Sequence, residues 1–181
     1  MTAGWGGLPG GRSAVSEIDF IGLGLMGEPM AQALARSGRA LRYGTAPPER
    51  CLPLQRLDAR VASSPDEVFE HCEVVLLMLS NAGAADEVLG RGTPRFTAVR
   101  DHVVVPMGTT APSYSEGLAA AVTAIGGDHI EAPVSGSRVP AERGELLMMF
   151  GGDNDVIDVV EPVLARRIGE PCAAVRRPVH C

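Results

Sequence analysis

The stretch that most restricts the fold of this 181-residue chain is "IDFIGLGLMGEPM", residues 18–30. An apolar segment of strand length leads directly into Gly22, Gly24 and Gly27, and a segment with helical spacing follows. In this context Gly22 allows a tight turn, Gly24 lets the backbone approach a pyrophosphate, and Gly27 lets the helix pack closely on the strand. Unpaired N–H groups and the dipole at the helix start favour an anion there. The pattern predicts a dinucleotide-binding loop, and the alternative is a plain strand-to-helix turn.

Three apolar runs with turn residues on both sides, "IDFIGL", "EVVLLMLS" and "HVVVPM", have the length of strands. Their continuous apolarity, without alternation, is typical of strands buried on both faces in a parallel sheet. Segments with helical spacing lie between and after these runs. They are residues 29–36, a segment that begins at Ser64 and Pro65, and residues 112–125. The alternation predicts an α/β fold, a Rossmann-type doubly wound and mostly parallel sheet with helices on both faces.

The end of the chain continues this pattern. Residues 144–153, "GELLMMFGGD", read as one further strand, and residues 153–167 read as a helix with Asp153 at its N-cap. The first 16 residues are Gly-rich without an apolar core, so we expect a disordered leader and not a secretory signal.

Composition excludes several classes of function. The net charge is −6 with both signs interspersed, which argues against a nucleic-acid surface. No apolar run approaches the roughly 18 residues of a membrane helix. Four scattered cysteines fit neither a zinc site nor a disulfide framework, so we expect reduced thiols and a cytoplasmic location. All 16 basic residues are Arg, which excludes a Walker-type phosphate loop, a Schiff-base lysine and a lysine general acid.

The residues that follow the second expected strand bear on the identity of the dinucleotide. An NAD site usually has an acid about 20 residues after the glycine loop, to bind the ribose 2′-hydroxyl. Here the region reads "LRYGTAPPERC", with no acid before Glu49 and with Arg42 and Arg50 nearby. We therefore expect NADP, with NAD possible, and assign Arg50 to the 2′-phosphate.

Four segments together resemble the β-hydroxyacid dehydrogenases: "FIGLGLMGEPMAQAL", "VVLLMLS", "MGTTAP" and "EAPVSGSRVPAERGELLMMFGGD". That family includes 3-hydroxyisobutyrate dehydrogenase and the glyoxylate and succinic semialdehyde reductases, and the similarity runs from about residue 18 to about residue 164. The resemblance implies an NAD(P)-dependent oxidoreductase acting on CH–OH groups. Such an enzyme transfers hydride between NADP(H) or NAD(H) and a small 3-hydroxy acid or semialdehyde.

The resemblance also implies roles for individual residues. The cofactor-binding set comprises the glycine loop, the end of the second buried strand, the "MGTT" segment and the arginine assigned above: Gly22, Leu23, Gly24, Leu25, Met26, Gly27, Leu79, Ser80, Thr109 and Arg50. Ser135, Gly136 and Ser137 are expected to bind the carboxylate of a small substrate through hydroxyl and backbone N–H donors.

Some positions depart from the family pattern. Gly108 stands where the family usually has Ser, and Thr45 and Ala46 stand where it usually has Asn-Arg. The family continues into an all-α domain that supplies a catalytic Lys, so no catalytic residue is assigned here. The expected organisation is a leader (1–16), an NAD(P)-binding domain (17–166) and a divergent tail (167–181). A truncated and impaired enzyme is therefore expected, and a non-catalytic NAD(P)-binding module or an interaction protein is the alternative.

The remaining candidates receive simple interpretations. The four His have no partner at metal or catalytic spacing and are expected at the surface or at strand ends. Glu131 is interpreted as a strand-end residue that orients the loop after it. Without the all-α domain we expect an exposed apolar patch, which favours a homo-oligomer or association with a partner.

Overall fold

A computed structural model describes residues 18–36, 41–44, 48–165 and 168–171 of the chain. Its strands are β1 Ile18–Ile21, β2 Leu41–Gly44, β3 Arg60–Val61, β4 Val74–Leu77, β5 Val103–Pro106, β6 Asp128–Glu131, β7 Val134–Ser135, β8 Leu146–Met148, β9 Gly151–Gly152 and β10 Gly169–Pro171. Its helices are α1 Gly27–Arg36, α2 Pro48–Gln55, α3 Pro65–Phe69, α4 Ala82–Leu89, the 3₁₀ helix η1 Pro94–Val99, α5 Pro112–Ala124, α6 Arg138–Arg143 and α7 Asn154–Leu164.

Seven strands form the main sheet in the order β3-β2-β1-β4-β5-β6-β9. All neighbouring pairs are parallel except β6 and β9. The strand order reverses between β1 and β4, where the chain switches from one side of β1 to the other. This is the mostly parallel, doubly wound sheet that the sequence predicts.

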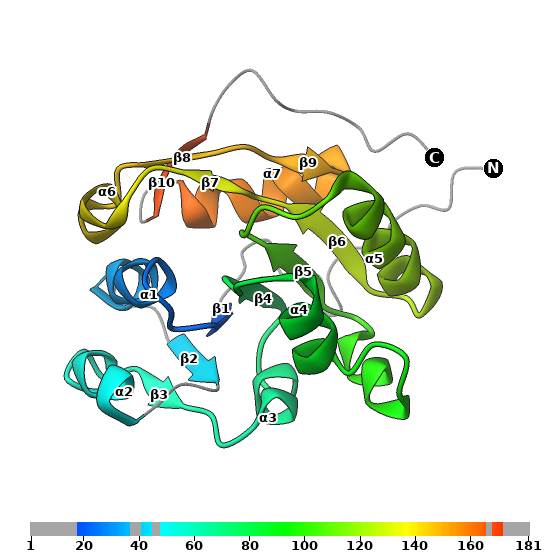
Figure 1. The fold of residues 1–181 in the computed structure, drawn as a ribbon, viewed down its shortest axis with the longest axis horizontal. Coiled ribbons are helices and arrows are strands. Elements are labelled where there is room, and N and C mark those ends of the chain that lie inside the picture. The colour runs from blue at the N-terminus through cyan, green and yellow to red at the C-terminus, as the bar shows by residue number, and fades with distance from the viewer. Residues whose placement is uncertain (1–17, 37–40, 45–47, 166–167, 172–181) are drawn as a thin grey trace.

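Helices cover both faces of the sheet (Figure 1). One buried cluster joins α1, α2 and α7 to residues such as Phe20 and Leu76, and the other joins α3, α4, η1 and α5 to residues such as Val75 and Val104. Strands β1 and β4 are buried at every position because helices press on both sides of them. Their continuous apolar sequences follow from this environment.

The predicted helix starts are confirmed where the structure describes them. The Ser64 side chain accepts a hydrogen bond from the Glu67 N–H, with Pro65 in the first turn of α3. The Asp153 side chain accepts from the Asp155 N–H at the start of α7. These oxygens satisfy N–H groups that have no partner within the helix.

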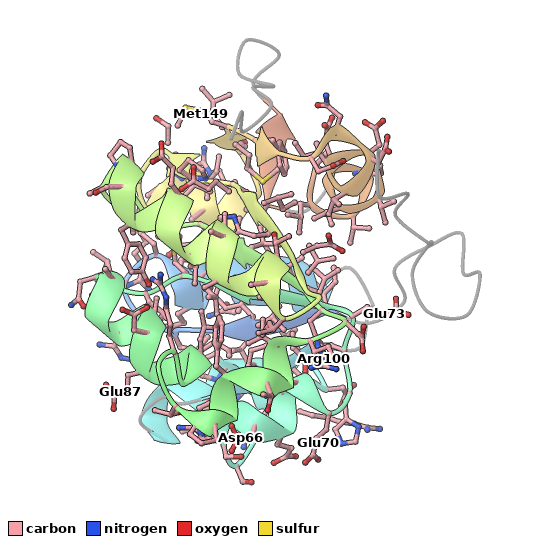
Figure 2. The ribbon with its side chains drawn as sticks, turned by 90° about the vertical axis from the view of Figure 1, so that its right-hand side faces the viewer. Asp66, Glu70, Glu73, Glu87, Arg100 and Met149 are labelled. Atoms are coloured by element: carbon pink, nitrogen blue, oxygen red, sulfur yellow. The ribbon has the colours of Figure 1, made fainter. Side chains whose placement is uncertain are left out.

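The single strand expected over residues 144–153 is wrong in detail. The segment forms two short strands that pair in different sheets: β8 lies between β7 and β10, whereas β9 pairs antiparallel with β6. Met149, labelled in Figure 2 at the outer edge of the molecule, lies between them. The second sheet extends to Pro171, past residue 166, where the sequence analysis ends the domain.

The histidines are expected at the surface or at strand ends, and His129, the second residue of β6, has a buried ring. It lies on β6, and both nitrogens of its ring are buried without a hydrogen-bond partner among the described residues. Burial lowers the pKa of His129 from its ordinary value of 6.5 to about 4, because the cationic ring would lose its hydration.

The low pKa of His129 predicts that the folded protein loses stability as the pH falls. Between pH 6.5 and about 4 the unfolded chain binds a proton at His129 that the folded chain does not. The free energy of unfolding should therefore fall as the pH falls through this window, by at most about 1.4 kcal/mol per pH unit from this group. Replacing His129 by Phe should flatten that slope in urea unfolding measured across the window, and an unchanged slope would contradict the assignment.

Candidate functional site

The expected site residues follow the carboxyl ends of parallel strands, which all lie at one edge of the main sheet. The glycine loop follows β1, Leu79 and Ser80 follow β4, and Thr109 follows β5. Ligands of open α/β sheets bind outside this edge, at the point where the strand order reverses. In this chain that point lies between β1 and β4.

Gly22 sits at the reversal point. Its φ is +103°, in the region that side chains disfavour. A Cβ at this position would collide with the carbonyl oxygen of Met78, which follows β4. The Met78 N–H donates to the Ile21 carbonyl at 2.9 Å, so the ends of β1 and β4 are held together at the loop.

The two other glycines of the motif meet opposite environments. A Cβ at Gly27 would collide with the Gly22 carbonyl oxygen and lie 3.2 Å from the Phe20 ring, so α1 can approach β1 only without a side chain there. A Cβ at Gly24 would meet nothing within 4 Å. Gly24 therefore leaves open space next to the first N–H groups of α1, as a pyrophosphate requires. The loop fits the phosphate groups of a dinucleotide.

The side chains between the glycines are oriented differently. Leu23 is buried in the core and Met26 packs against it, whereas Leu25 is 67% exposed. Leu23 can therefore contact a ligand only through its backbone, while Leu25 lies open to solvent at the loop.

Arg50 reaches the glycine loop from α2. Its Nη1 donates a 2.8 Å hydrogen bond to the Leu23 carbonyl. The guanidinium therefore lies beside the loop, as a role at a cofactor phosphate requires, and it also holds the loop. Thr45 and Ala46 lie outside the described residues, and the side chain of Arg42 is likewise not described.

Leu79 connects the loops after β1, β4 and β5. Its side chain would lie 3.0 Å from a Cβ at Gly22, and its carbonyl oxygen would lie 3.1 Å from a Cβ at Gly108. A side chain at position 108 would therefore crowd this oxygen. Ser80 and Thr109 are both exposed at the same edge.

The expected substrate loop runs beside the end of β5. The Ala132 N–H donates to the Pro106 carbonyl at 2.9 Å, and the Val134 N–H donates to the Met107 carbonyl at 3.3 Å. Ser135, Gly136 and Ser137 follow, and all three are exposed.

Two features shape this loop. Gly136 has a φ of +144°, and a Cβ there would lie 2.5 Å from Leu146 Cδ2, so only glycine fits. Ser137 stands at the N-cap of α6, but among the described residues its hydroxyl makes no capping hydrogen bond. The hydroxyl is thus available to a ligand.

Glu131 is the last residue of β6, the strand-end position that the sequence suggests. One of its carboxylate oxygens accepts a hydrogen bond from the hydroxyl of Ser115 on α5. This contact ties the end of β6 to α5 just before the chain enters the substrate loop.

A polar cluster behind the site escapes the sequence analysis. Tyr114 on α5 contacts Asp86 on α4, and Arg91 lies against both. The partners are 28 residues apart, and the residues near Tyr114 show no motif that would point to Asp86. Burial and the Asp86 carboxylate raise the pKa of Tyr114 to about 12, so the phenol keeps its proton.

The described part of the chain shows neither a metal-binding cluster nor a membrane-spanning helix. No three His, Cys, Asp or Glu side chains there are grouped as a metal site. Its helices also fall short of the length and hydropathy that a transmembrane segment requires.

Comparison with known proteins agrees with this geometry. A family model described as the NAD binding domain of 6-phosphogluconate dehydrogenase matches residues 17–175. The 2-hydroxy-3-oxopropionate reductase of Escherichia coli (strain K12) is 33% identical over 150 residues, covering 81% of this chain and 50% of the relative. The mitochondrial 3-hydroxyisobutyrate dehydrogenase of Mus musculus is 34% identical over 156 residues, covering 84% of this chain and 47% of the relative.

A solved structure described as Psf3 in complex with NADP+ and 2-OPP is also similar. It aligns with a TM-score of 0.80 at 26% identity and covers 90% of this chain and 57% of that one. The chain thus spans about half the length of the curated relatives it matches.

Proposed function

Because this chain belongs to the family of the NAD binding domain of 6-phosphogluconate dehydrogenase, we propose that it binds NADP, or NAD as the alternative, at the β1–β4 reversal point. The observation that supports this most directly is the contrast within the loop: Gly22 and Gly27 are closely packed, and Gly24 faces open space. Ligand phosphates would accept hydrogen bonds from N–H groups of the glycine loop at the start of α1, because the Glu28 and Met30 N–H groups already donate to the Gly24 and Met26 carbonyls.

The proposed reaction class follows from the relatives, which are named as reductases and dehydrogenases of small hydroxy acids and semialdehydes. When bound, the nicotinamide cofactor supplies hydride chemistry. In this proposal Leu79 and Ser80 border the adenosine and nicotinamide ribose side of the cofactor, and Thr109 lies near the nicotinamide. Ser135, the Gly136 N–H and Ser137 hold the carboxylate of a small 3-hydroxy acid or semialdehyde through oriented donors.

The experiment that tests cofactor binding compares wild type with Gly24→Val by calorimetric titration with NADPH and NADH. The branched side chain would occupy the space proposed for the phosphates, and no protein atom lies within 4 Å of the position of its Cβ. We expect loss of measurable cofactor binding with a melting temperature close to that of wild type. Unchanged NADPH affinity in this variant would show that the loop is only a turn.

The place of Arg50 beside the loop predicts a preference between cofactors. Arg50→Ala should weaken NADPH about 10- to 100-fold, because a charge-assisted bond to the 2′-phosphate is lost, and should weaken NADH less, through the lost bond to Leu23. Arg56→Ala, which removes the same charge just beyond the other end of α2, is the matched control and should change neither affinity. Equal losses for NADPH and NADH would remove Arg50 from the 2′-phosphate.

The composition predicts weak catalysis by these 181 residues alone. Hydride transfer to a carbonyl leaves negative charge on its oxygen, and general acid help is worth about 10²- to 10⁴-fold in rate. The resemblance to the β-hydroxyacid dehydrogenases assigns this task to a Lys, and this sequence contains none. We expect NADPH-dependent reduction of succinic semialdehyde or glyoxylate at a small fraction of the rate of the relatives. Fast turnover that Thr109→Ala or Ser135→Ala abolishes would contradict this expectation.

A further inference from the structure

We propose that Tyr114 is a positioning residue, which sets the separation of the two loops that border the nicotinamide half of the cofactor. It acts through a cluster of three side chains, Tyr114, Asp86 and Arg91, here named the Tyr114 clasp. The inference rests on the proposed cofactor site and extends it, because none of the three residues belongs to the glycine loop or to the substrate loop.

The centre of the clasp is the phenolic hydroxyl of Tyr114. It lies 2.9 Å from Asp86 Oδ1 and 3.1 Å from the Ala82 carbonyl oxygen, so its proton is directed at two acceptors of α4. Ala82 is the first residue of α4. The phenol therefore connects the first turn of α5 to the first turn of α4.

Arg91 completes the clasp from the end of α4. Its Nη1 lies 3.5 Å from Asp86 Oδ1, and its Nη2 donates to the Gly117 carbonyl of α5 at 2.7 Å. Its guanidinium carbon lies 5.6 Å from the centre of the Tyr114 ring, within the range of a cation–π contact. Two separate side chains thus bridge α4 and α5.

These bridges join two helices whose backbones pack mainly on other elements. Helix α4 packs most closely on η1, and α5 packs on β6. Both helices lie on the same face of the sheet (Figures 1 and 2). Glu87, the neighbour of Asp86, is exposed and is labelled in Figure 2 at the outer edge of the molecule.

The clasp lies directly behind the proposed cofactor edge. Ser80 leads into the N-cap of α4 at Asn81, whose side chain accepts from the Ala84 N–H. Thr109 leads into α5, whose N-cap position, Ala111, has no side-chain hydrogen bond to its helix within the described chain. Because a helix moves as a rigid body, a displacement at one residue also displaces its first residues. The start of α5 therefore depends on Tyr114 for its position relative to α4.

The test compares wild type with Tyr114→Phe, which keeps the ring over Arg91 and removes only the hydroxyl. Two ligands are titrated: NADPH, which spans both halves of the site, and 2′,5′-ADP, which reaches only the adenosine half. We expect the Kd of NADPH to rise about three- to tenfold and that of 2′,5′-ADP to stay within about twofold. Equal changes for both ligands, or no change for NADPH, would overturn the proposal.

A matched control separates positioning from general loosening of the helix. Val122→Ala removes a fully buried side chain on the same helix, far from the clasp. It should lower the melting temperature more than Tyr114→Phe does and leave NADPH affinity unchanged. The same selective loss of NADPH in Val122→Ala would refute a specific role for Tyr114.

Variants of Asp86, which accepts the hydrogen bond from Tyr114, test the clasp independently. Asp86→Asn keeps an oxygen for the hydroxyl of Tyr114 and should retain most of the wild-type affinity for NADPH, whereas Asp86→Ala should lose as much as Tyr114→Phe. The double variant of Tyr114→Phe and Asp86→Ala should lose no more than either single variant, and additive losses would contradict the clasp. A wild-type chain that binds neither NADPH nor NADH refutes the proposed function itself. Normal wild-type binding without a selective loss in Tyr114→Phe refutes the clasp alone.

Discussion

The backbone contact between Gly27, Gly22 and Met78 is the constraint on which the rest of this site depends. A side chain at Gly22 or Gly27 would collide with a carbonyl oxygen, so the start of α1 can lie against the ends of β1 and β4 only because both residues are glycine. The first N–H groups of a helix generally have no partner within it, but at the start of α1 Glu28 and Met30 donate to the Gly24 and Met26 carbonyls, and Pro29 has no N–H. The glycine loop itself therefore supplies the N–H groups for an anion at the reversal point of the sheet, and the open space at Gly24 gives an anion access to them.

The loops around that point are held from outside by long-range contacts. Arg50 binds the Leu23 carbonyl of the glycine loop, and the Val134 N–H binds the Met107 carbonyl beside the substrate loop. Tyr114 joins the helices behind Ser80 and Thr109. Loops that are exposed and built of small residues have little packing of their own, so such contacts determine their geometry. The polar side chains behind the edge therefore matter to the site although they do not reach a ligand.

The sequence predicts the parts of this structure whose signals are local. Strands β1, β4 and β5 are apolar at nearly every position because both faces are buried, and the glycine motif lies within a few residues of the strand that precedes it. The division of residues 144–153 into β8 and β9 is not predictable in this way. Apolar residues show that a segment is buried, but they do not identify the strand with which it pairs, and here the partners are β7, β10 and β6. The contacts of Arg50 and Tyr114 join residues 27 and 28 positions apart, and no pattern in either segment indicates the other.

The side chains assigned to the ligand-binding edge of the sheet can bind anions, but they cannot donate a proton to a substrate. The polar side chains assigned to the ligands there are the hydroxyls of Ser80, Thr109, Ser135 and Ser137 and the guanidinium of Arg50. A hydroxyl donates hydrogen bonds without giving up its proton near neutral pH, and the guanidinium of arginine stays protonated in proteins. Such groups orient phosphates and carboxylates well, but they do not pass a proton to a carbonyl oxygen. In the proposed reaction, these residues therefore recognise the anionic ends of cofactor and substrate, and a general acid must come from a side chain other than these five.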